Sequence, residues 1–261
     1  MANRWLFLIV ALGLASAICT AQAPTSDPQA LALVAKSVAA MTGGQPVSGV
    51  TLNAKAIWVA GSNYFTGTAT LQGKGTTDSL VTLNLNGFTR TENRTQSGGI
   101  PSGTWSEASA TPQPLPLHNC WSDAVWFFPA LSSLTQAVVD TNFFFSYVGQ
   151  EQHGGVSTQH IRWFQLLQND RSNVLQVQRL STSDVYLDSS SFLPVAVAFE
   201  AHPDKDMTRD VPMEIGFANY QVVNGVQVPF HIQRMLNGSV ILDLTVTNAV
   251  MNSAVSLSQA Q

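Results

Sequence analysis

The stretch that decides the fold is "NYQVVNGVQVPFHIQRMLNGSVILDLTV", residues 219–246. It contains two Asn-Gly pairs, and Asn-Gly is the preferred centre of a two-residue β-hairpin turn. Between these turns Val228, Phe230 and Ile232 recur at every second position, which places their side chains on one face of a strand. The stretch therefore predicts antiparallel strands that turn back twice, with one apolar face and no cluster of reactive side chains.

The same two-residue period continues over most of the chain. Val81, Leu83 and Leu85 alternate with Thr82 and Asn84, which is typical of an antiparallel sheet with one face in water. Gly, Asn and Ser separate such segments at short intervals. The period predicts strands at residues 49–60, 63–74, 79–86, 88–96, 104–108, 142–150, 156–167, 184–188, 193–201, 212–223, 226–236 and 239–251.

A helix is predicted before the first of these strands. Ser26 and Asp27 are residue types that cap helix N-termini, and Pro28 suits the first turn. Apolar residues then recur at three- and four-residue spacing over 31–41, and glycines at 43–44 end the pattern. Because the helix has one apolar stripe, we expect it to cover a face of the sheet.

A helical insertion is predicted in the middle of the chain. Residues 111–117, "TPQPLPL", contain prolines that exclude a central strand or a helix interior, so we expect a crossing loop. The next stretch, "NCWSDAVWFFPALSSLTQAVV" (119–139), has helical character, and Pro129 divides it into two short helices. Residues 169–182 are ambiguous between helix and strand. We find no linker and expect one domain over 22–261.

The N-terminus has the features of a secretory signal peptide, residues 1–21. Arg4 precedes an apolar run that ends near Ile18 in small residues, and this run is shorter than the roughly 20 residues of a transmembrane helix. Cys19 invites a lipoprotein interpretation, but Ser16 and Ile18 do not fit the residues required before a lipidated cysteine. We therefore expect a soluble protein that is periplasmic or secreted.

Composition excludes several classes of protein. The formal net charge is −4, so nucleic acid is not an expected partner. The hydrophobic content of 45% is enough for a sizeable core. Only Cys120 remains after removal of the leader, which excludes a scaffold held by disulfides.

Two stretches in the second half carry a resemblance to a known group: "VYLDSSSFLPVAVAFEAHPD" (185–204) and "EIGFANYQVVNGVQVPFHIQRMLNG" (214–238). They resemble the superfamily of the lipoprotein carrier LolA, the receptor LolB and the stress regulator RseB. The resemblance implies an α+β fold: a strongly curved antiparallel sheet, or half-barrel, with an N-terminal helix and a helical insertion covering its concave face. The matching residues are Asp188, Leu193, Pro194, Tyr220, Gly225, Pro229 and Phe230.

The resemblance also implies a function. We expect an exported protein that binds a lipid or lipoprotein acyl chain, with peripheral membrane contact. The alternative is an envelope interaction or stress-sensing module, whose partner would be an envelope protein and which would transport no lipid.

No motif for catalysis or cofactor binding is present, so we expect neither an enzyme nor a cofactor. His202, Asp204 and Asp206 could hold a metal ion, but they lack the spacing of a Ca²⁺ loop, and we expect a solvated turn. His118 and Cys120 stand two apart, and we interpret the lone Cys as a buried small apolar residue and not as a nucleophile.

Apolar side chains at strand spacing are the most conspicuous feature that remains. They form an ordinary core or, in the sharper hypothesis, the wall of an incompletely filled cavity for acyl chains, where each buried methylene contributes about 0.8 kcal/mol. Such a cavity needs no catalytic group. The predicted wall and lid residues are Trp126, Phe127, Phe128, Phe143, Phe145, Tyr147, Trp163, Phe199 and Phe230.

Overall fold

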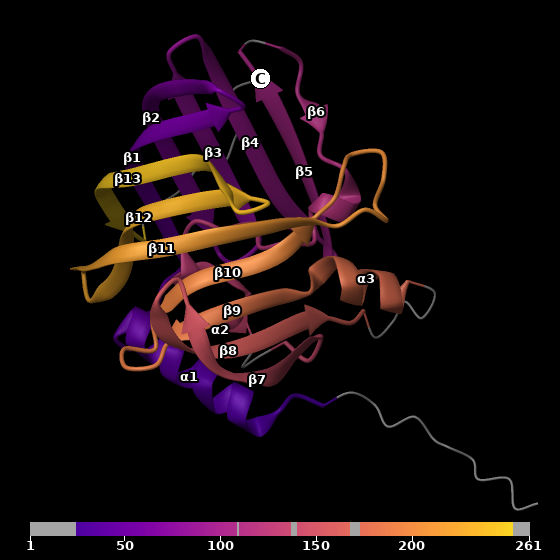
Figure 1. Cartoon of the computed structure of the whole chain (residues 1–261), viewed down its shortest axis with the longest axis vertical. Coiled ribbons are helices and arrows are strands. Elements are labelled where there is room, and N and C mark those ends of the chain that lie inside the picture. The colour runs from indigo at the N-terminus through magenta and orange to yellow at the C-terminus, as the bar shows by residue number, and fades with distance from the viewer. Residues whose placement is uncertain (1–24, 109, 137–139, 168–172, 253–261) are drawn as a thin grey trace, which may run out of the picture.

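The computed structural model describes residues 25–108, 110–136, 140–167 and 173–252. The predicted signal peptide lies outside these residues, so its assignment remains a prediction. The described part is mostly β, with one antiparallel sheet of 13 strands, an N-terminal helix and a few short helices (Figure 1). The strand order is β6-β5-β4-β3-β2-β1-β13-β12-β11-β10-β9-β8-β7. The elements are α1 (Pro28–Thr42), β1 (Gly49–Ala60), β2 (Asn63–Lys74), β3 (Asp78–Leu85), β4 (Phe88–Ser97), β5 (Ile100–Glu107), β6 (Gln113–Pro114), η1 (Leu117–Asn119), η2 (Pro129–Leu131), α2 (Ser133–Gln136), β7 (Phe143–His153), β8 (Val156–Gln165), α3 (Val174–Ser181), β9 (Ser183–Asp188), β10 (Pro194–Ala201), β11 (Val211–Val223), β12 (Val226–Leu236) and β13 (Ser239–Met251).

The strands predicted from the two-residue period are all present, with bounds that shift by a few residues at most. The structure adds the short strand β6 after β5 and places α3 within the stretch that the sequence leaves ambiguous. The predicted N-terminal helix is α1, where Asp27 caps the first turn by accepting a hydrogen bond from the amide of Gln29. Gly43, with φ 58°, ends it in the left-handed conformation.

The two Asn-Gly pairs form the predicted hairpin turns. Asn224 and Gly225 have φ values of 51° and 83°, and Asn237 and Gly238 have φ values of 49° and 74°. Positive φ at both central residues is the requirement of a type I′ turn, whose twist matches that of the strands it joins. These turns connect β11 to β12 and β12 to β13 in antiparallel register. The conformation of the two turns therefore determines how these three strands pair.

The path of the chain places an aromatic segment over the sheet. β1 pairs with β13 near the middle, whereas β6 and β7 form the opposite edges. The chain between these edges must therefore cross a face of the sheet. Residues 117–136, here called the aromatic insertion, lie on that crossing, where the hydroxyl of Ser79 donates to the carbonyl oxygen of Ala124 over 2.6 Å.

Both edges of the sheet are protected against pairing with another chain. The amide of Asp27 donates to the carbonyl oxygen of Phe145 over 2.8 Å, and the amide of Phe145 donates to Ser26 Oγ over 3.1 Å, so the residues before α1 cover the β7 edge. At the opposite edge, β6 is only two residues long and contains Pro114. Short strands and proline are devices that prevent edge-to-edge association.

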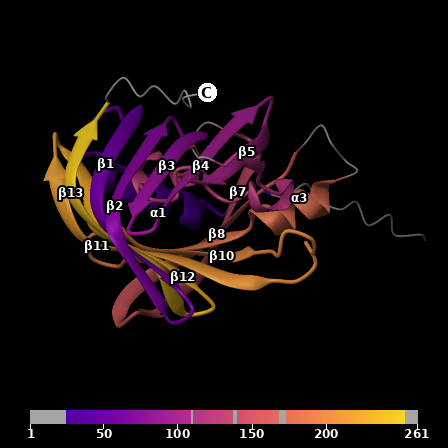
Figure 2. The same ribbon diagram turned by 90° about the horizontal axis from the view of Figure 1, so that it is seen from above.

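One continuous core lies between the sheet and its cover. Figure 2 shows α1 on the inner side of the sheet, and α1 contacts β12 and β7. Val34 and Met41 of α1 are buried together with Phe127 and Phe128 of the aromatic insertion. The same core includes inward-facing side chains from strands on both sides of the β1–β13 pair, such as Leu71 of β2 and Ile232 of β12. The cover therefore joins the two halves of the sheet.

Three expectations about the fold need correction. The aromatic insertion is not a pair of helices: it contains two 3₁₀ turns and the four-residue α2. Trp126, Phe127 and Phe128 are all buried, and a helix cannot turn three consecutive side chains toward one face. The fold is also mostly β and not α+β. None of the helices in the described ranges has the length and hydrophobicity needed to cross a bilayer.

The third correction concerns curvature. The resemblance implies a strongly curved half-barrel, but the sheet is open and not strongly curled. The inner face is occupied by α1 and by large aromatic side chains of the insertion. Because close-packed side chains resist compression, this filling keeps the two edges apart.

A glycine in β2 allows a close approach of two strands and provides a test of this packing. A Cβ added at Gly67 would lie 1.9 Å from the carbonyl oxygen of Asn84, which is backbone and cannot move aside. We expect Gly67→Ala to lower the free energy of unfolding by about 2–3 kcal/mol, because β2 and β3 must separate locally. Urea denaturation measures this change.

Gly216 is the matched control, since it also lies inside a strand. A Cβ there would meet only the flexible Cε of Met235 at 3.6 Å. Gly216→Ala should change the stability by no more than about 0.5 kcal/mol. Equal effects of the two substitutions would show that strand glycines matter here only through the unfolded state.

Candidate functional site

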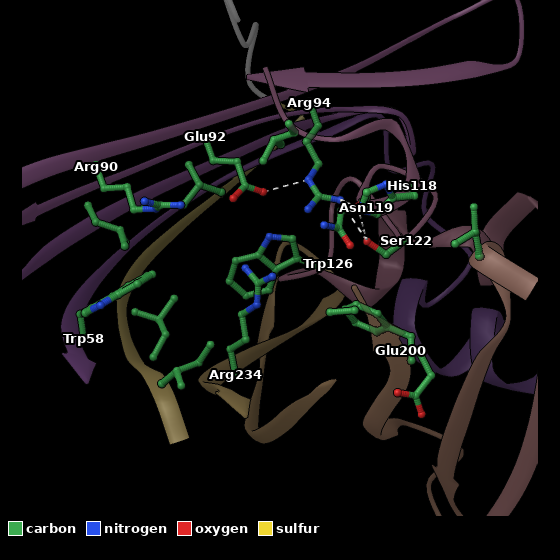
Figure 3. Close-up of a pocket in the computed structure, with 18 residues that line it drawn as sticks. Trp58, Arg90, Glu92, Arg94, His118, Asn119, Ser122, Trp126, Glu200 and Arg234 are labelled. Atoms are coloured by element: carbon green, nitrogen blue, oxygen red, sulfur yellow. Dashed lines mark hydrogen bonds and ion pairs between the residues drawn. The ribbon is translucent and has the colours of Figure 1, made fainter. Parts of the chain in front are cut away.

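A cavity of about 210 Å³ lies where the two halves of the sheet meet the aromatic insertion (Figure 3). Strands β1, β3, β4, β10, β12 and β13 contribute to its wall, together with α3 and the insertion. The wall is mainly apolar, with charged side chains concentrated on β4 and β12. The lining residues are Trp58, Val81, Leu83, Arg90, Glu92, Arg94, Leu115, His118, Asn119, Ser122, Trp126, Leu180, Phe199, Glu200, Ala201, Arg234, Ile241 and Leu242.

The charged part of the wall begins on β4. Arg90, Glu92 and Arg94 occupy alternate positions of the strand, so they share one face. Arg90 is in register with Leu83 and Glu92 with Val81, two apolar wall residues on β3. The inner face of β4 therefore continues an apolar wall with a row of charges.

Arg94 and Glu92 form a nearly buried ion pair. Arg94 Nε donates to Glu92 Oε1 over 2.8 Å, and the two side chains are 7% and 15% exposed. A second donor, Arg94 Nη1, reaches Ser122 Oγ over 3.0 Å and so ties the aromatic insertion to β4. Burial would raise the pKa of the Glu92 carboxyl, but the charges of Arg94 and Arg234 outweigh it and hold that pKa below its ordinary value.

Arg90, the first of these three charged residues of β4, forms an ion pair with a neighbouring strand. Its Nη1 donates to Glu107 Oε1 over 2.8 Å. The guanidinium carbon lies 4.7 Å from the ring centre of Trp105 and 5.5 Å from that of Trp58. Arg90 thus has both a carboxylate and two aromatic faces as neighbours.

Arg234 differs from the other two arginines. It follows Ile232 at the next inward position of β12, and its guanidinium carbon lies 5.3 Å from the ring centre of Trp126 (Figure 3). Within the described part of the chain it takes part in no ion pair, and its buried Nε has no hydrogen-bond partner. Burial lowers the pKa of this guanidinium, but arginine stays charged at neutral pH.

The structure separates the predicted wall and lid residues into two groups. Trp126 and Phe199 line the cavity. The rest belong to the filled core or pack against it, so their role in binding a ligand stays a prediction that depends on movement of the insertion. The core members are Phe127, Phe128, Phe143, Phe145 and Trp163, and Tyr147 and Phe230 are half-buried against them.

Sequence reasoning did not identify the charged wall. In the stretch "RTENRT" of β4 both faces of the strand are polar. The alternation of apolar and polar residues that identifies the inward face of other strands is therefore missing here. Arg234 does carry a signal, since it continues the alternation of Val228, Phe230 and Ile232. Its partner Trp126 is more than a hundred residues away in the chain, and nothing local indicates that the two meet.

The other polar candidates have structural partners. His202 Nε2 lies 3.0 Å from Asp210 Oδ1, and Asp206 Oδ1 accepts from the hydroxyl of Thr208 over 2.6 Å. Burial lowers the pKa of His202, and nearby Arg179 adds to this shift. Among the described residues, no group of three or more His, Cys, Asp or Glu side chains is arranged to hold a metal ion.

His118 and Cys120 each contact a backbone carbonyl. His118 Nε2 lies 3.1 Å from the oxygen of Pro203, and Cys120 Sγ lies 3.4 Å from that of Pro116. Burial raises the pKa of the Cys120 thiol, which disfavours the reactive thiolate. The arrangement agrees with a buried structural cysteine.

Comparison with known proteins gives similarity in structure and not in sequence. No protein-family model matches the chain, and no curated protein matches it. A domain from Vibrio parahaemolyticus that carries the name outer membrane lipoprotein-sorting protein matches with a TM-score of 0.55 and 12% identity, over 88% of this chain and 94% of that one. A DUF1329 family protein from Desulfovibrio piger matches with a TM-score of 0.53 and 10% identity, over 87% and 94%. A LolA superfamily protein from Nitrosomonas europaea gives 0.49 and 12%, over 87% and 94%.

The first two matches cover 88% and 87% of this chain. At 12% and 10% identity they concern the fold alone. The resemblance that the hairpin motifs predict is confirmed at this level. The chain shares its fold with the Vibrio parahaemolyticus domain named for lipoprotein sorting and with the DUF1329 family protein.

Proposed function

We propose that residues 22–261 form one exported domain that binds a hydrophobic ligand, a lipid or a lipoprotein acyl chain, in the periplasm or outside the cell. The observation that carries the proposal is the apolar cavity beneath Trp126, at the junction of both halves of the sheet. The fold shared with a domain named for lipoprotein sorting supports it. In this proposal the inner face of the open sheet acts as the wall of the binding site, and delivery takes place at a membrane surface.

The size of the cavity requires a movable cover. Its 210 Å³ is below the roughly 300–1,000 Å³ of typical ligand sites. A long acyl chain therefore fits only if side chains of the aromatic insertion move away. Phe127 and Phe128 lie against the inner face of the sheet, and their displacement would open the apolar strand faces of the core to the ligand.

The contacts of the aromatic insertion are suited to such a movement. It is held at its start by Asn119, whose side chain exchanges two hydrogen bonds with the backbone of His202. Arg94 and Ser79 each hold it to the sheet by polar contacts. Few polar contacts therefore need to break, and the apolar surface exposed by the movement would be covered again by the ligand.

Native mass spectrometry of the mature protein tests the proposal. The protein is purified from its own envelope without detergent, and bound lipid is then extracted. We expect a discrete additional mass that releases a lipid. An apo mass that stays unchanged after incubation with envelope lipids would exclude the carrier function.

The alternative, an envelope interaction or sensing module, is favoured by the filled core, since most of the predicted wall residues pack against each other. Exposed apolar side chains near α3 offer a surface for a protein partner, namely Leu175 (80% exposed), Leu117 (52%) and Ile100 (46%). A clean apo mass together with specific capture of one envelope protein, lost in Leu175→Asp, would support this alternative.

A further inference from the structure

The cavity contains a positive charge, Arg234, that forms no ion pair with any of the described residues. Glu107 pairs with Arg90, and Glu92 pairs with Arg94, so each of these acids is already engaged by an arginine. Arg234 has no carboxylate at ion-pair distance among the described residues. A charge held in a partly dry site is unfavourable unless an opposite charge accompanies it.

Two unmatched donors accompany this charge. The Nε of Arg234 and the Nε1 of Trp126 are both buried without a hydrogen-bond partner. The two side chains are neighbours, with the guanidinium over the indole ring, and both line the cavity (Figure 3). The ring offsets part of the charge but offers no acceptor to either N–H group. An oxyanion in the cavity would supply both the acceptor and the opposite charge.

The wall next to this pair is apolar. Leu83, Leu242 and Phe199 line the same cavity as Arg234. A ligand that satisfies the whole site therefore has a negative head and a hydrocarbon tail. Glu92 acts electrostatically on Arg234 but is bound by Arg94. The Arg94–Glu92 pair and the Arg90–Glu107 pair are each neutral, so the charge of Arg234 remains for the head. Glu200 is exposed to solvent.

We propose that the cavity selects amphiphiles with an anionic head group, a carboxylate or a phosphate, which is bound by Arg234 and Trp126 while the tail lies along the apolar wall. This inference rests on the proposed function, since it specifies the class of hydrophobic ligand. Neutral or cationic amphiphiles with the same tail bind more weakly.

Competition among ligands with one tail and different heads tests the inference. The purified protein is mixed with equal amounts of palmitate, hexadecyl phosphate, hexadecanol and hexadecyltrimethylammonium, below the concentrations at which they aggregate, and the complexes are counted by native mass spectrometry. We expect the two anions to exceed hexadecanol by at least about 10-fold. The stronger of the two anions identifies a carboxylate or a phosphate as the better head group.

Three variants assign the preference to Arg234. Arg234→Gln should reduce the preference for anions over hexadecanol to within about 2-fold, whereas Arg234→Lys should keep a preference because the charge remains. Lys55→Gln removes one positive charge from an exposed position of β1 and should change nothing. This control excludes an effect of net charge.

The outcomes separate the inference from the function on which it rests. Binding of none of the four amphiphiles would overturn both. Equal binding of palmitate and hexadecanol by the unmodified protein would leave the proposed function standing and overturn the selection for anions. An equal loss of all ligands in Arg234→Gln, with an unchanged circular dichroism spectrum, would show that Arg234 supports the wall and does not bind the head.

Discussion

The variant Glu92→Gln is expected to lower the free energy of unfolding at neutral pH by about 3 kcal/mol, because it breaks an ion pair that is almost removed from water. Arg94 would keep its contact with Ser122 but lose its carboxylate. Arg234, which forms no ion pair within the described ranges, would lose the negative charge that acts on it most strongly. Urea denaturation at neutral pH measures the change.

Glu107→Gln is the matched control. It makes the same chemical change in a carboxylate that also pairs with an arginine of β4, but Glu107 is 52% exposed and Glu92 only 15%. An exposed pair contributes at most about 1 kcal/mol. Similar losses in the two variants would mean that burial does not strengthen the Glu92–Arg94 pair.

The effect of Glu92 should depend on pH in a defined direction. Its folded-state pKa lies below the ordinary 4.5, since the attraction of Arg94 and Arg234 outweighs burial, which acts in the opposite direction. A carboxyl with a lowered pKa stabilises the folded state above its unfolded-state pKa and loses this contribution as the pH falls through the folded-state value. The difference between the unmodified protein and Glu92→Gln should therefore be complete at neutral pH and shrink below about pH 4.5.

A double-mutant cycle connects this pair to the unpaired arginine. Glu92→Gln leaves both Arg94 and Arg234 without a nearby negative charge. In an Arg234→Met background only Arg94 is affected, so the cost of Glu92→Gln should fall by about 1 kcal/mol. Additive effects would place Glu92 and Arg234 too far apart to interact. Such a result would also weaken the case for an electrostatically coupled cavity.

The sequence predicted most of the sheet because its signals are local. The Asn-Gly turns need positive φ, which few other residues supply, and both turns occur where predicted. The two-residue period likewise depends only on neighbouring residues, so the strands are in place. The curvature of the sheet has no local signal. It depends on how much space α1 and the insertion occupy over the inner face.

The insertion and the site show the limits of the same reasoning. The local pattern predicts helices for the insertion, but its three consecutive rings are all buried against the sheet. That contact depends on strands far away in the chain, which the local pattern does not include. The cavity combines β4, β12 and the insertion, which are far apart in the chain. Trp126 was named as a lid residue, yet its contact with Arg234 depends on the crossing of the chain from one edge of the sheet to the other.

Locking the aromatic insertion to the sheet should abolish uptake of a long acyl chain. A Cβ added at Gly73 of β2 would lie 2.6 Å from Cγ1 and 3.3 Å from Cγ2 of Val125. A disulfide in the variant Gly73→Cys/Val125→Cys would join β2 to the insertion at this contact, in a Cys120→Ala background that removes the native thiol. We expect the oxidised form to bind palmitate at least about 10-fold more weakly than the reduced form, because the cavity with a fixed cover is below the roughly 300 Å³ of typical ligand sites.

The same protein provides its own control, since adding a reductant should restore binding. The crosslink should also raise the free energy of unfolding by about 3 kcal/mol, as it closes a long loop in the unfolded chain. A gain in stability together with a loss of binding separates a locked cover from a damaged fold, which would lose both. If the oxidised form binds palmitate as well as the reduced form does, the insertion need not move, and the space beside Arg234 and Trp126 holds the ligand without opening the core.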